Sequence, residues 1–377
     1  MRRFEFVGRG SAKFWEIGQR GPEVTVHFGR LGTKGQTQTK DLGSETSASV
    51  HISKLISEKL GKGYVETTSG GAAADNRPLG PVDYRTGVTR PPVLPPYAVP
   101  RIPDDGPVAI GEIHLPAGRR LTGDPTMAPP GIEMISAPVV WLTDVQVADA
   151  GRLLSALRTG SASIGLVPML LTSMEADDTR PWESHEFSPT DPRRTDHFDA
   201  GQVLADMWRG SVAEDDEESL DPVQPFGLEF PGLAAAPAVN PPSGFGRLFA
   251  KASDPSDDRA VLALLRSRRI GLVAANRPAD VITALGWLGG TNMHQDPVLM
   301  SVVLRSWEDR WAARVVEIGF DTMTLTVGIP PRDRQSALAL AAEHFAFCPD
   351  NIWQGSGTIL AYAESIQQSR TWSFWWD

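Results

Sequence analysis

Two aromatic blocks lie near the end of the sequence, residues 343–355 (EHFAFCPDNIWQG) and residues 372–377 (WSFWWD). They hold the only cysteine and four of the eleven tryptophans of the 377-residue chain. Exposed aromatic runs of this kind promote aggregation unless they are packed into a core. We therefore expect both blocks to complete the core of a large C-terminal domain, with Phe345, Phe347, Trp353 and residues 372–376 as packing side chains.

The length and composition are those of a globular protein with about two or three domains. Apolar residues make up 41% of the chain and charged residues 22%, which excludes a disordered chain. No apolar run reaches the roughly 18 residues that a membrane-spanning helix needs, and the first residues lack the apolar core of a signal peptide. The single cysteine, Cys348, excludes an intrachain disulfide. These features predict a soluble, cytoplasmic protein.

The net charge of −10 is unevenly distributed along the chain. Residues 1–66 contain 11 Lys or Arg against 7 Asp or Glu, a balance of +4, so the rest of the chain carries 25 against 39, a balance of −14. Polyanions such as nucleic acids are attracted by the first part and repelled by the second. The pattern predicts a small basic head attached to a large acidic body.

The basic head has the pattern of a small antiparallel sheet with one helix. Residues 3–7, 13–17 and 23–28 alternate apolar with polar side chains, as strands do, and glycine-containing turns separate them. Ser44 can cap a following helix, whose apolar residues recur at helical spacing up to Leu60.

An ordered series of motifs runs through the head. It consists of Phe4, residues 13–17 (KFWEI), residues 29–32 (GRLG), residues 35–37 (GQT) and residues 54–64 (KLISEKLGKGY). With these motifs, nearly all of residues 1–66 resembles the WGR domain, a module named for a Trp-Gly-Arg triplet, and in particular its bacterial members. The triplet reads Phe28-Gly29-Arg30 here, so a stacking face is kept and the indole donor is lost.

The resemblance implies a nucleic-acid-binding module, because WGR domains are best known for recognising DNA breaks in poly(ADP-ribose) polymerases. The aromatic residue and the arginine of the triplet lie at that interface, which implies a binding role for Phe28 and Arg30. We expect Lys34, Lys40 and Arg9 to add phosphate contacts from neighbouring turns. In the alternative interpretation Phe28 is a core residue, and Arg30 caps carbonyl groups or bridges to the next domain.

A linker and a larger domain follow the head. Residues 67–107 begin as a flexible Gly- and Ala-rich spacer and continue as a stiffer Pro-rich segment. Residues 108–377 alternate strand and helix patterns, including a helix opened by Asp296-Pro297. We expect an α+β protein: a small head, with an antiparallel sheet plus one helix, tethered to a larger mixed α/β domain that is best defined over residues 254–377.

Four blocks of the body form a second recognisable series. They are residues 306–310 (SWEDR), 319–321 (GFD), 342–351 (AEHFAFCPDN) and 372–377 (WSFWWD). With these blocks, residues from about 108 to 377 resemble a bacterial family known as domain of unknown function 4253. That family has no established activity, so the resemblance implies no chemistry.

The third of these blocks, residues 342–351, suggests a candidate catalytic site. His344 and Cys348 are four residues apart on an expected helix and so share a face, with Asp350 and Asn351 just beyond its end. Thiol, imidazole and carboxamide groups are the parts of a Cys-His nucleophile, and with Glu343 they are also metal ligands. The alternative is packing, because cysteine is among the most buried residue types and a histidine in an apolar helix is usually a core residue.

Two further segments place histidine beside carboxylates, residues 182–186 (WESHE) and 196–199 (DHFD). Metal and acid–base sites have this composition, and so do solvated loops. The sequence contains no Walker lysine motif and no dinucleotide fingerprint. We therefore expect neither a metal nor another cofactor.

The leading functional hypothesis joins a nucleic-acid-binding or docking head, with DNA as its partner, to an acidic binding or regulatory body. One alternative is an enzyme, a hydrolase or transferase that uses His344, Cys348 and Asp350. Another alternative is a head that docks only on a protein partner. No membrane partner is expected.

Overall fold

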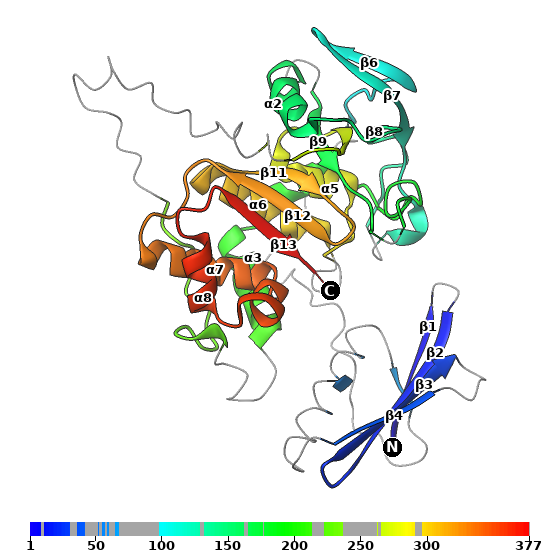
Figure 1. Ribbon diagram of the computed structural model, residues 1–377, viewed down its shortest axis with the longest axis vertical. Coiled ribbons are helices and arrows are strands. Elements are labelled where there is room, and N and C mark those ends of the chain that lie inside the picture. The colour runs from blue at the N-terminus through cyan, green and yellow to red at the C-terminus, as the bar shows by residue number, and fades with distance from the viewer. Residues whose placement is uncertain are drawn as a thin grey trace. The chain divides into compact units, whose positions relative to one another are not determined.

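The computed structural model describes most of the chain, which divides into two compact units, Met1–Pro91 and Pro92–Asp377 (Figure 1). The described residues are 1–8, 11–30, 36–41, 52, 55–56, 59, 65–67, 98–128, 132–161, 165–175, 177–212, 222–236, 262, 265–290 and 296–376. Each unit has its own sheet and its own core. No helix within these residues is long and apolar enough to cross a lipid bilayer.

Five antiparallel strands form the sheet of the first unit, in the order β4-β3-β2-β1-β5. They are β1 (Arg2–Gly8), β2 (Ser11–Arg20), β3 (Glu23–Arg30), β4 (Gln36–Asp41) and β5 (Val65–Glu66). The three strands expected from alternation are confirmed. The polar segment QTQTKD adds a further strand, β4. Its sequence has no apolar alternation that would predict a strand, and it is held in the sheet by its pairing with β3.

One face of this sheet carries a small core. Its buried apolar side chains are Phe4, Trp15, Ile17, Val24 and Ile56. The helix expected from Ser44 to Leu60 is described at residues 52, 55, 56 and 59, which are all helical, and the rest of it lies outside the described residues. Ile56 packs with the sheet residues, so the apolar face of this segment covers the sheet, as its helical spacing predicts.

The second unit is built on an eight-stranded mixed sheet with the order β13-β12-β11-β9-β10-β8-β7-β6. Its strands are β6 (Gly106–Ile110), β7 (Ile113–Leu121), β8 (Val140–Thr143), β9 (Val167–Leu171), β10 (Arg269–Val273), β11 (Ala313–Ile318), β12 (Thr322–Val327) and β13 (Thr371–Trp375). Neighbouring strands are antiparallel, except β9 and β11, which are parallel. The α+β class expected from the sequence is confirmed.

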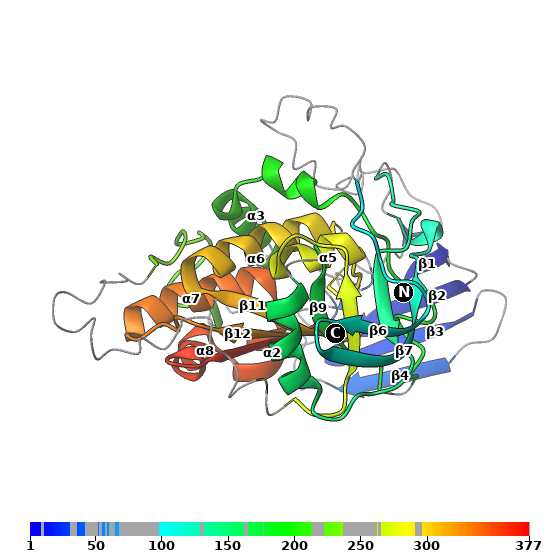
Figure 2. The same cartoon turned by 90° about the horizontal axis from the view of Figure 1, so that it is seen from above.

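Helices pack on both faces of this sheet (Figures 1 and 2). They are α2 (Ala150–Ser161), α3 (Ala200–Val212), α5 (Val281–Leu285), α6 (Pro297–Trp311), α7 (Arg334–Phe347) and α8 (Ile359–Ile366), with the 3-10 turns η1 (Pro125–Met127), η2 (Pro192–His197) and η5 (Pro278–Asp280) and the π-helix η6 (Asn351–Ser356). Leu170 of β9 lies in the core with α2, whereas Met169 and Leu171 lie in the core with α6 and α7. The central strands are therefore buried on both faces, which explains their nearly continuous apolar sequence.

Part of the expected linker packs onto the second unit. Within residues 67–107, residues 68–97 lie outside the described part of the chain, whereas Ile102 is 6% exposed and belongs to the core beside α2. The division into a head of residues 1–66, a linker and a body of residues 108–377 stays a prediction.

The C-terminal strand β13 completes the larger core. Trp372, Phe374 and Trp376 are each 1% exposed. The ring of Phe374 is stacked on that of Trp307 in α6 with 5.5 Å between centroids, and the ring of Trp372 meets Trp307 edge-on at 5.7 Å. The expected packing of the closing block into the core is confirmed for these alternate residues.

Two tryptophans differ from the expectation that both aromatic blocks are wholly packed. Trp375 of β13 is 39% exposed, because successive residues of a strand point to opposite faces. Trp353 of η6 is 43% exposed, although its ring packs edge-on against Phe345 with centroids 5.3 Å apart. The two blocks therefore close the core and also present two half-exposed rings.

A buried carboxylate joins the helices beneath the closing strand. Glu343 of α7 is 0% exposed, and it accepts hydrogen bonds from Arg310 Nη1 at 2.8 Å, Trp307 Nε1 at 2.8 Å and the backbone N–H of Ala234 at 2.7 Å. Arg310 also donates to the carbonyl oxygen of Ala234 at 2.8 Å. A buried charge is stable only when it is paired and hydrogen bonded. This carboxylate thus ties α6, α7 and the segment around residue 234 together.

Replacing Glu343 by alanine should strongly destabilise the second unit, because it leaves the Arg310 guanidinium, whose side chain is 15% exposed, without its counter-charge. Removing one member of a buried ion pair costs about 3–5 kcal/mol. Urea denaturation followed by circular dichroism measures the change in the free energy of unfolding.

The matched control is Glu364→Ala on the neighbouring helix α8. The side chain of Glu364 is 69% exposed and lies 3.9 Å from Arg334. Loss of such a surface pair changes the free energy of unfolding by about 0–1 kcal/mol. Equal effects of the two substitutions would contradict a central role for Glu343.

Candidate functional site

Two basic residues from different strands lie at the same end of the head sheet. Strands β1 to β4 form an antiparallel meander, so β1 ends and β2 begins where β3 ends and β4 begins. Lys13 of β2 and Arg30 of β3 are cross-strand partners at this end. Arg9 lies between β1 and β2 in the sequence and Lys34 between β3 and β4, although both fall outside the described residues. Strand register thus brings two basic residues, Lys13 and Arg30, together at one end of the sheet.

The other two residues predicted to bind nucleic acid, Phe28 and Lys40, lie elsewhere along the strands. The backbone of Phe28 is paired with Trp15, a buried residue of the core. Lys40 is paired with Val24, toward the opposite end of the sheet. The register therefore separates Lys40 from Arg30, which sequence reasoning had grouped together.

A charge cluster that sequence patterns did not single out lies on the same sheet. Arg3 donates to Glu5 Oε1 and to Glu16 Oε1, both at 2.8 Å, and His27 Nδ1 lies 2.7 Å from Glu16 Oε2. These hydrogen bonds, first from His27 and then from Arg3, lower the pKa of Glu16. The Arg3 guanidinium also lies over the ring of Phe14, 4.8 Å from its centroid. Arg3 and Glu5 lie on the same face of β1, whereas strand register brings Glu16 of β2 and His27 of β3 to them.

The candidate catalytic residues of the body lie around the end of α7. His344 is 0% exposed, and its Nδ1 lies 3.1 Å from the hydroxyl oxygen of Tyr362. The thiol of Cys348 donates to the carbonyl oxygen of Trp375, with 3.0 Å between Sγ and O. Asp350 follows at 8% exposure. The three residues are close in sequence and all buried, while the imidazole and the thiol are each directed to a different partner.

Asn351 occupies the outer edge of β13. Its side-chain nitrogen donates to the carbonyl oxygen of Ser373 at 2.8 Å, and its side-chain oxygen accepts from the N–H of Trp375 at 3.2 Å. Further along the same edge, Ser369 Oγ donates to the carbonyl oxygen of Thr371 at 2.6 Å. A free strand edge is a template for pairing with another chain. Side chains fill that template here, and the carboxamide of Asn351 takes the place of a neighbouring strand.

Burial moves the pKa values of this cluster away from those of catalytic groups. Burial, followed by the positive charge of Arg310, holds the pKa of His344 well below its ordinary value. Burial raises the pKa of Cys348 to about 12 and also raises the pKa of Tyr362. A cysteine nucleophile needs a lowered pKa and some exposure. The arrangement therefore favours packing over catalysis for His344 and Cys348.

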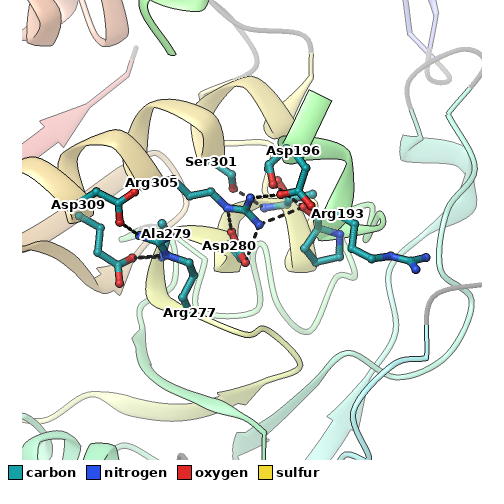
Figure 3. Close-up of polar contacts among 12 residues, drawn as sticks. Arg193, Asp196, Arg277, Ala279, Asp280, Ser301, Arg305 and Asp309 are labelled. Atoms are coloured by element: carbon teal, nitrogen blue, oxygen red, sulfur yellow. Dashed lines mark hydrogen bonds and ion pairs between the residues drawn. The ribbon is translucent and has the colours of Figure 1, made fainter. Parts of the chain in front are cut away.

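The other histidine and carboxylate segments are engaged in ion pairs. Arg305 of α6 binds both Asp196 and the buried Asp280, so it joins η2 and η5 to α6 (Figure 3). Glu186 pairs with Arg180 at 2.6 Å. Among the residues that the structure describes, no three His, Cys, Asp or Glu side chains are gathered to hold a metal ion.

Cys348 should resist modification in the native protein. With its pKa raised to about 12, roughly one thiol in ten thousand is ionised at about pH 8. Ellman's reagent should therefore react only as fast as the protein unfolds, and promptly in denaturant. Rapid stoichiometric modification of the folded protein would instead restore the nucleophile hypothesis.

The buried, neutral His344 should make the fold less stable in mild acid. Because its folded pKa lies well below its unfolded value of about 6.5, the unfolded state binds the proton first as the pH falls. The free energy of unfolding then decreases by up to about 1.4 kcal/mol per pH unit from this group. A His344→Gln variant lacks this titration, so the wild-type advantage over the variant should shrink from about pH 7 to about pH 5 in urea denaturation. A constant difference would contradict a buried neutral imidazole.

Two family models match the chain. The WGR domain model matches residues 1–71, and the model described as Domain of unknown function (DUF4253) matches residues 269–377. The first match extends slightly past the expected head, and the second begins at β10 rather than at residue 108. Strands β6 to β9 precede this second match and belong to the same sheet.

Known proteins resemble parts of the chain. Protein YehF of Escherichia coli (strain K12) is 42% identical over 66 residues, which cover 18% of this chain and 24% of that protein. Uncharacterized protein YfeS of the same strain is 38% identical over 65 residues, which cover 17% and 27%. The matched part thus spans about a quarter of the length of these relatives. A crystal structure of a Bacteroides fragilis protein is 51% identical over 18% of this chain and 19% of that chain, with a TM-score of 0.18. From the family matches, residues 1–71 are a WGR domain and residues 269–377 are a DUF4253 domain, joined in one chain.

Proposed function

We propose that the chain binds DNA through its WGR domain, and that the acidic body acts as a binding or regulatory domain. The observation that carries this proposal is the register of the head sheet, which pairs Lys13 of β2 with Arg30 of β3 at one end. Arg9 and Lys34 flank these strands in the sequence, and we expect them to add positive charge. A guanidinium binds phosphate oxygens as a fork, and ammonium groups add point charges. Several basic groups at one end of a small sheet form the kind of patch that a polyanion requires.

The triplet Phe28-Gly29-Arg30 supports the same proposal. Arg30 belongs both to the basic end of the sheet and to the motif that the WGR resemblance assigns to the interface. Phe28 precedes it on β3 and supplies a flat ring of the kind that packs against a base or sugar. Because the backbone partner of Phe28 is the buried Trp15, a core role is the alternative for Phe28.

The charge of the body supports a division of labour. Residues 67–377 carry 25 basic against 39 acidic residues, so the body repels phosphate groups. Several of its arginines are also engaged in ion pairs, for example Arg194 with Asp296 at 2.6 Å and Arg269 with Glu183 at 2.8 Å. We therefore assign DNA contacts to the head and a docking or regulatory role to the body.

Binding of the full-length protein to a short DNA duplex should weaken as the salt concentration rises. Each phosphate contact contributes about −0.9 to the slope of log affinity against log salt concentration. Arg30→Ala should weaken binding and reduce the magnitude of that slope by about 0.9. Fluorescence anisotropy of a labelled duplex measures both quantities.

Arg20→Ala is the matched control, because Arg20 is exposed, pairs in register with Glu23 and lies toward the opposite end of the same sheet. Phe28→Trp should retain binding if the ring stacks on DNA, whereas Phe28→Ala should lose binding and keep the fold. Loss of folding in Phe28→Ala would assign Phe28 to the core. Indifference of binding to both salt and Arg30→Ala would reject a DNA-binding head.

A further inference from the structure

A cavity opens beside strands β11, β12 and β13 of the second unit. Its volume is about 550 Å³, which is the size of a small-molecule site. Its lining includes the polar or aromatic residues Arg268, Glu317, Thr324, Asn351, Ser373 and Trp375. All of its lining residues belong to the second unit, so the site shares no residue with the head.

The lining contains one cation and one anion, which neutralise each other. Arg268 Nε donates to Glu317 Oε1, and Arg268 Nη1 donates to the carbonyl oxygen of Arg266 at 2.9 Å. Arg268 Nη2 has no hydrogen-bond partner within the described part of the chain. The other lining residues are Thr, Met, Asn, Ser, Phe and Trp, all uncharged. A charge-balanced cavity with a spare donor complements an uncharged polar ligand better than an ion.

Polar side chains form a row across three strands. Glu317, Thr324 and Ser373 are successive cross-strand partners in β11, β12 and β13, so they follow one another at strand spacings of about 4.8 Å. Glu317 Oε2 accepts a long hydrogen bond from Thr324 Oγ1 at 3.5 Å and retains acceptor capacity. A carboxylate with free lone pairs suits vicinal hydroxyl groups, as acidic residues do at the hydroxyls of a ribose.

Trp375 adds a flat apolar surface to the same cavity. It is 39% exposed, and its ring stacks on no other aromatic ring among the described residues. Its backbone is held on both sides, by β12 and by the side chains of Asn351 and Cys348. An exposed ring on an immobilised strand offers a stacking face at little ordering cost.

We propose that this cavity binds an uncharged ligand that combines a flat face with vicinal hydroxyl groups, the chemistry shared by ribonucleosides and sugars. The flat face packs on Trp375, and the hydroxyl groups donate to Glu317. Arg268 Nη2 and the hydroxyl of Ser373 bind ligand oxygens. Trp375 lies two residues beyond Ser373, roughly 7 Å along the strand, a separation that one nucleoside spans.

Isothermal titration calorimetry of the full chain tests the ligand class with adenosine, 2′-deoxyadenosine, adenosine monophosphate and glucose. Adenosine or glucose should bind with a dissociation constant of about 1 mM or tighter. Binding of adenosine alone identifies a nucleoside site, and binding of glucose alone identifies a sugar site. If adenosine binds, loss of its 2′-hydroxyl should weaken binding about tenfold, and the phosphate of adenosine monophosphate should bring no gain.

Variants test the named side chains. Trp375→Ala should weaken binding about tenfold or more, whereas Trp353→Ala, which removes the other half-exposed tryptophan outside the lining, should leave binding unchanged. Glu317→Gln leaves Arg268 without its counter-charge, so adenosine monophosphate should then bind more tightly than adenosine. Ser373→Ala changes an exposed side chain and weakens binding without disturbing the fold, which circular dichroism verifies for every variant.

Three results would overturn the proposal. They are the absence of binding by both adenosine and glucose, an equal loss of binding in the two tryptophan variants, and a wild-type preference for adenosine monophosphate over adenosine. None of these results bears on DNA binding by the head, because the cavity and the head share no residues.

Discussion

The buried carboxylate of Glu343 is the constraint on which the larger domain depends. A carboxylate without solvent contact must find several donors close by, and Glu343 finds them in Arg310 and Trp307 of α6 and in the backbone of Ala234. These bonds fix the position of α7 against α6 and hold the indole of Trp307 in one orientation. Phe374 of the closing strand then stacks on that indole at 5.5 Å. The aromatic C-terminal block thus packs against helices whose relative position depends on the hydrogen bonds of one buried carboxylate.

Catalysis and packing use the same residue types near the end of α7, but they require opposite environments. The imidazole of His344 is enclosed by the rings of Trp307, Trp372 and Phe374, with centroids 4.6, 4.5 and 5.0 Å away, and burial keeps such a ring neutral. The thiol of Cys348 ends at a backbone carbonyl of β13, on the edge that Asn351 also fills. These polar groups therefore hold the closing strand β13 in place. His344 packs against its aromatic rings, and Cys348 and Asn351 form hydrogen bonds with its backbone.

Sequence signals were sufficient where structure depends on neighbours in the chain. Asp296 accepts from the N–H of Val298 and opens α6, as the Asp-Pro pair predicts, and alternation located the first three strands of the head. Contacts between distant segments carry no local signal, and Arg268 meets Glu317 across 49 positions. The same limit applies to the candidate site. The spacing of His344 and Cys348 could be read from the sequence, whereas their burial and partners depend on strands and helices that arrive from elsewhere.

The distribution of paired charge supports the separate roles that we propose for the two units. Several arginines of the body pair with carboxylates: Arg119 with Asp144, Arg194 with Asp296, Arg269 with Glu183, Arg277 with Asp309 and Arg305 with Asp280. A guanidinium in such a pair must give up its partner before it can bind a phosphate, and the surplus of acidic residues repels polyanions. In the head, Arg3 is likewise held by Glu5 and Glu16, but Lys13 and Arg30 are cross-strand partners of the same sign. The DNA contacts that we propose fall at this end of the head sheet, where Lys13 and Arg30 pair in register. The charge-balanced cavity of the body is the site that we propose for an uncharged ligand.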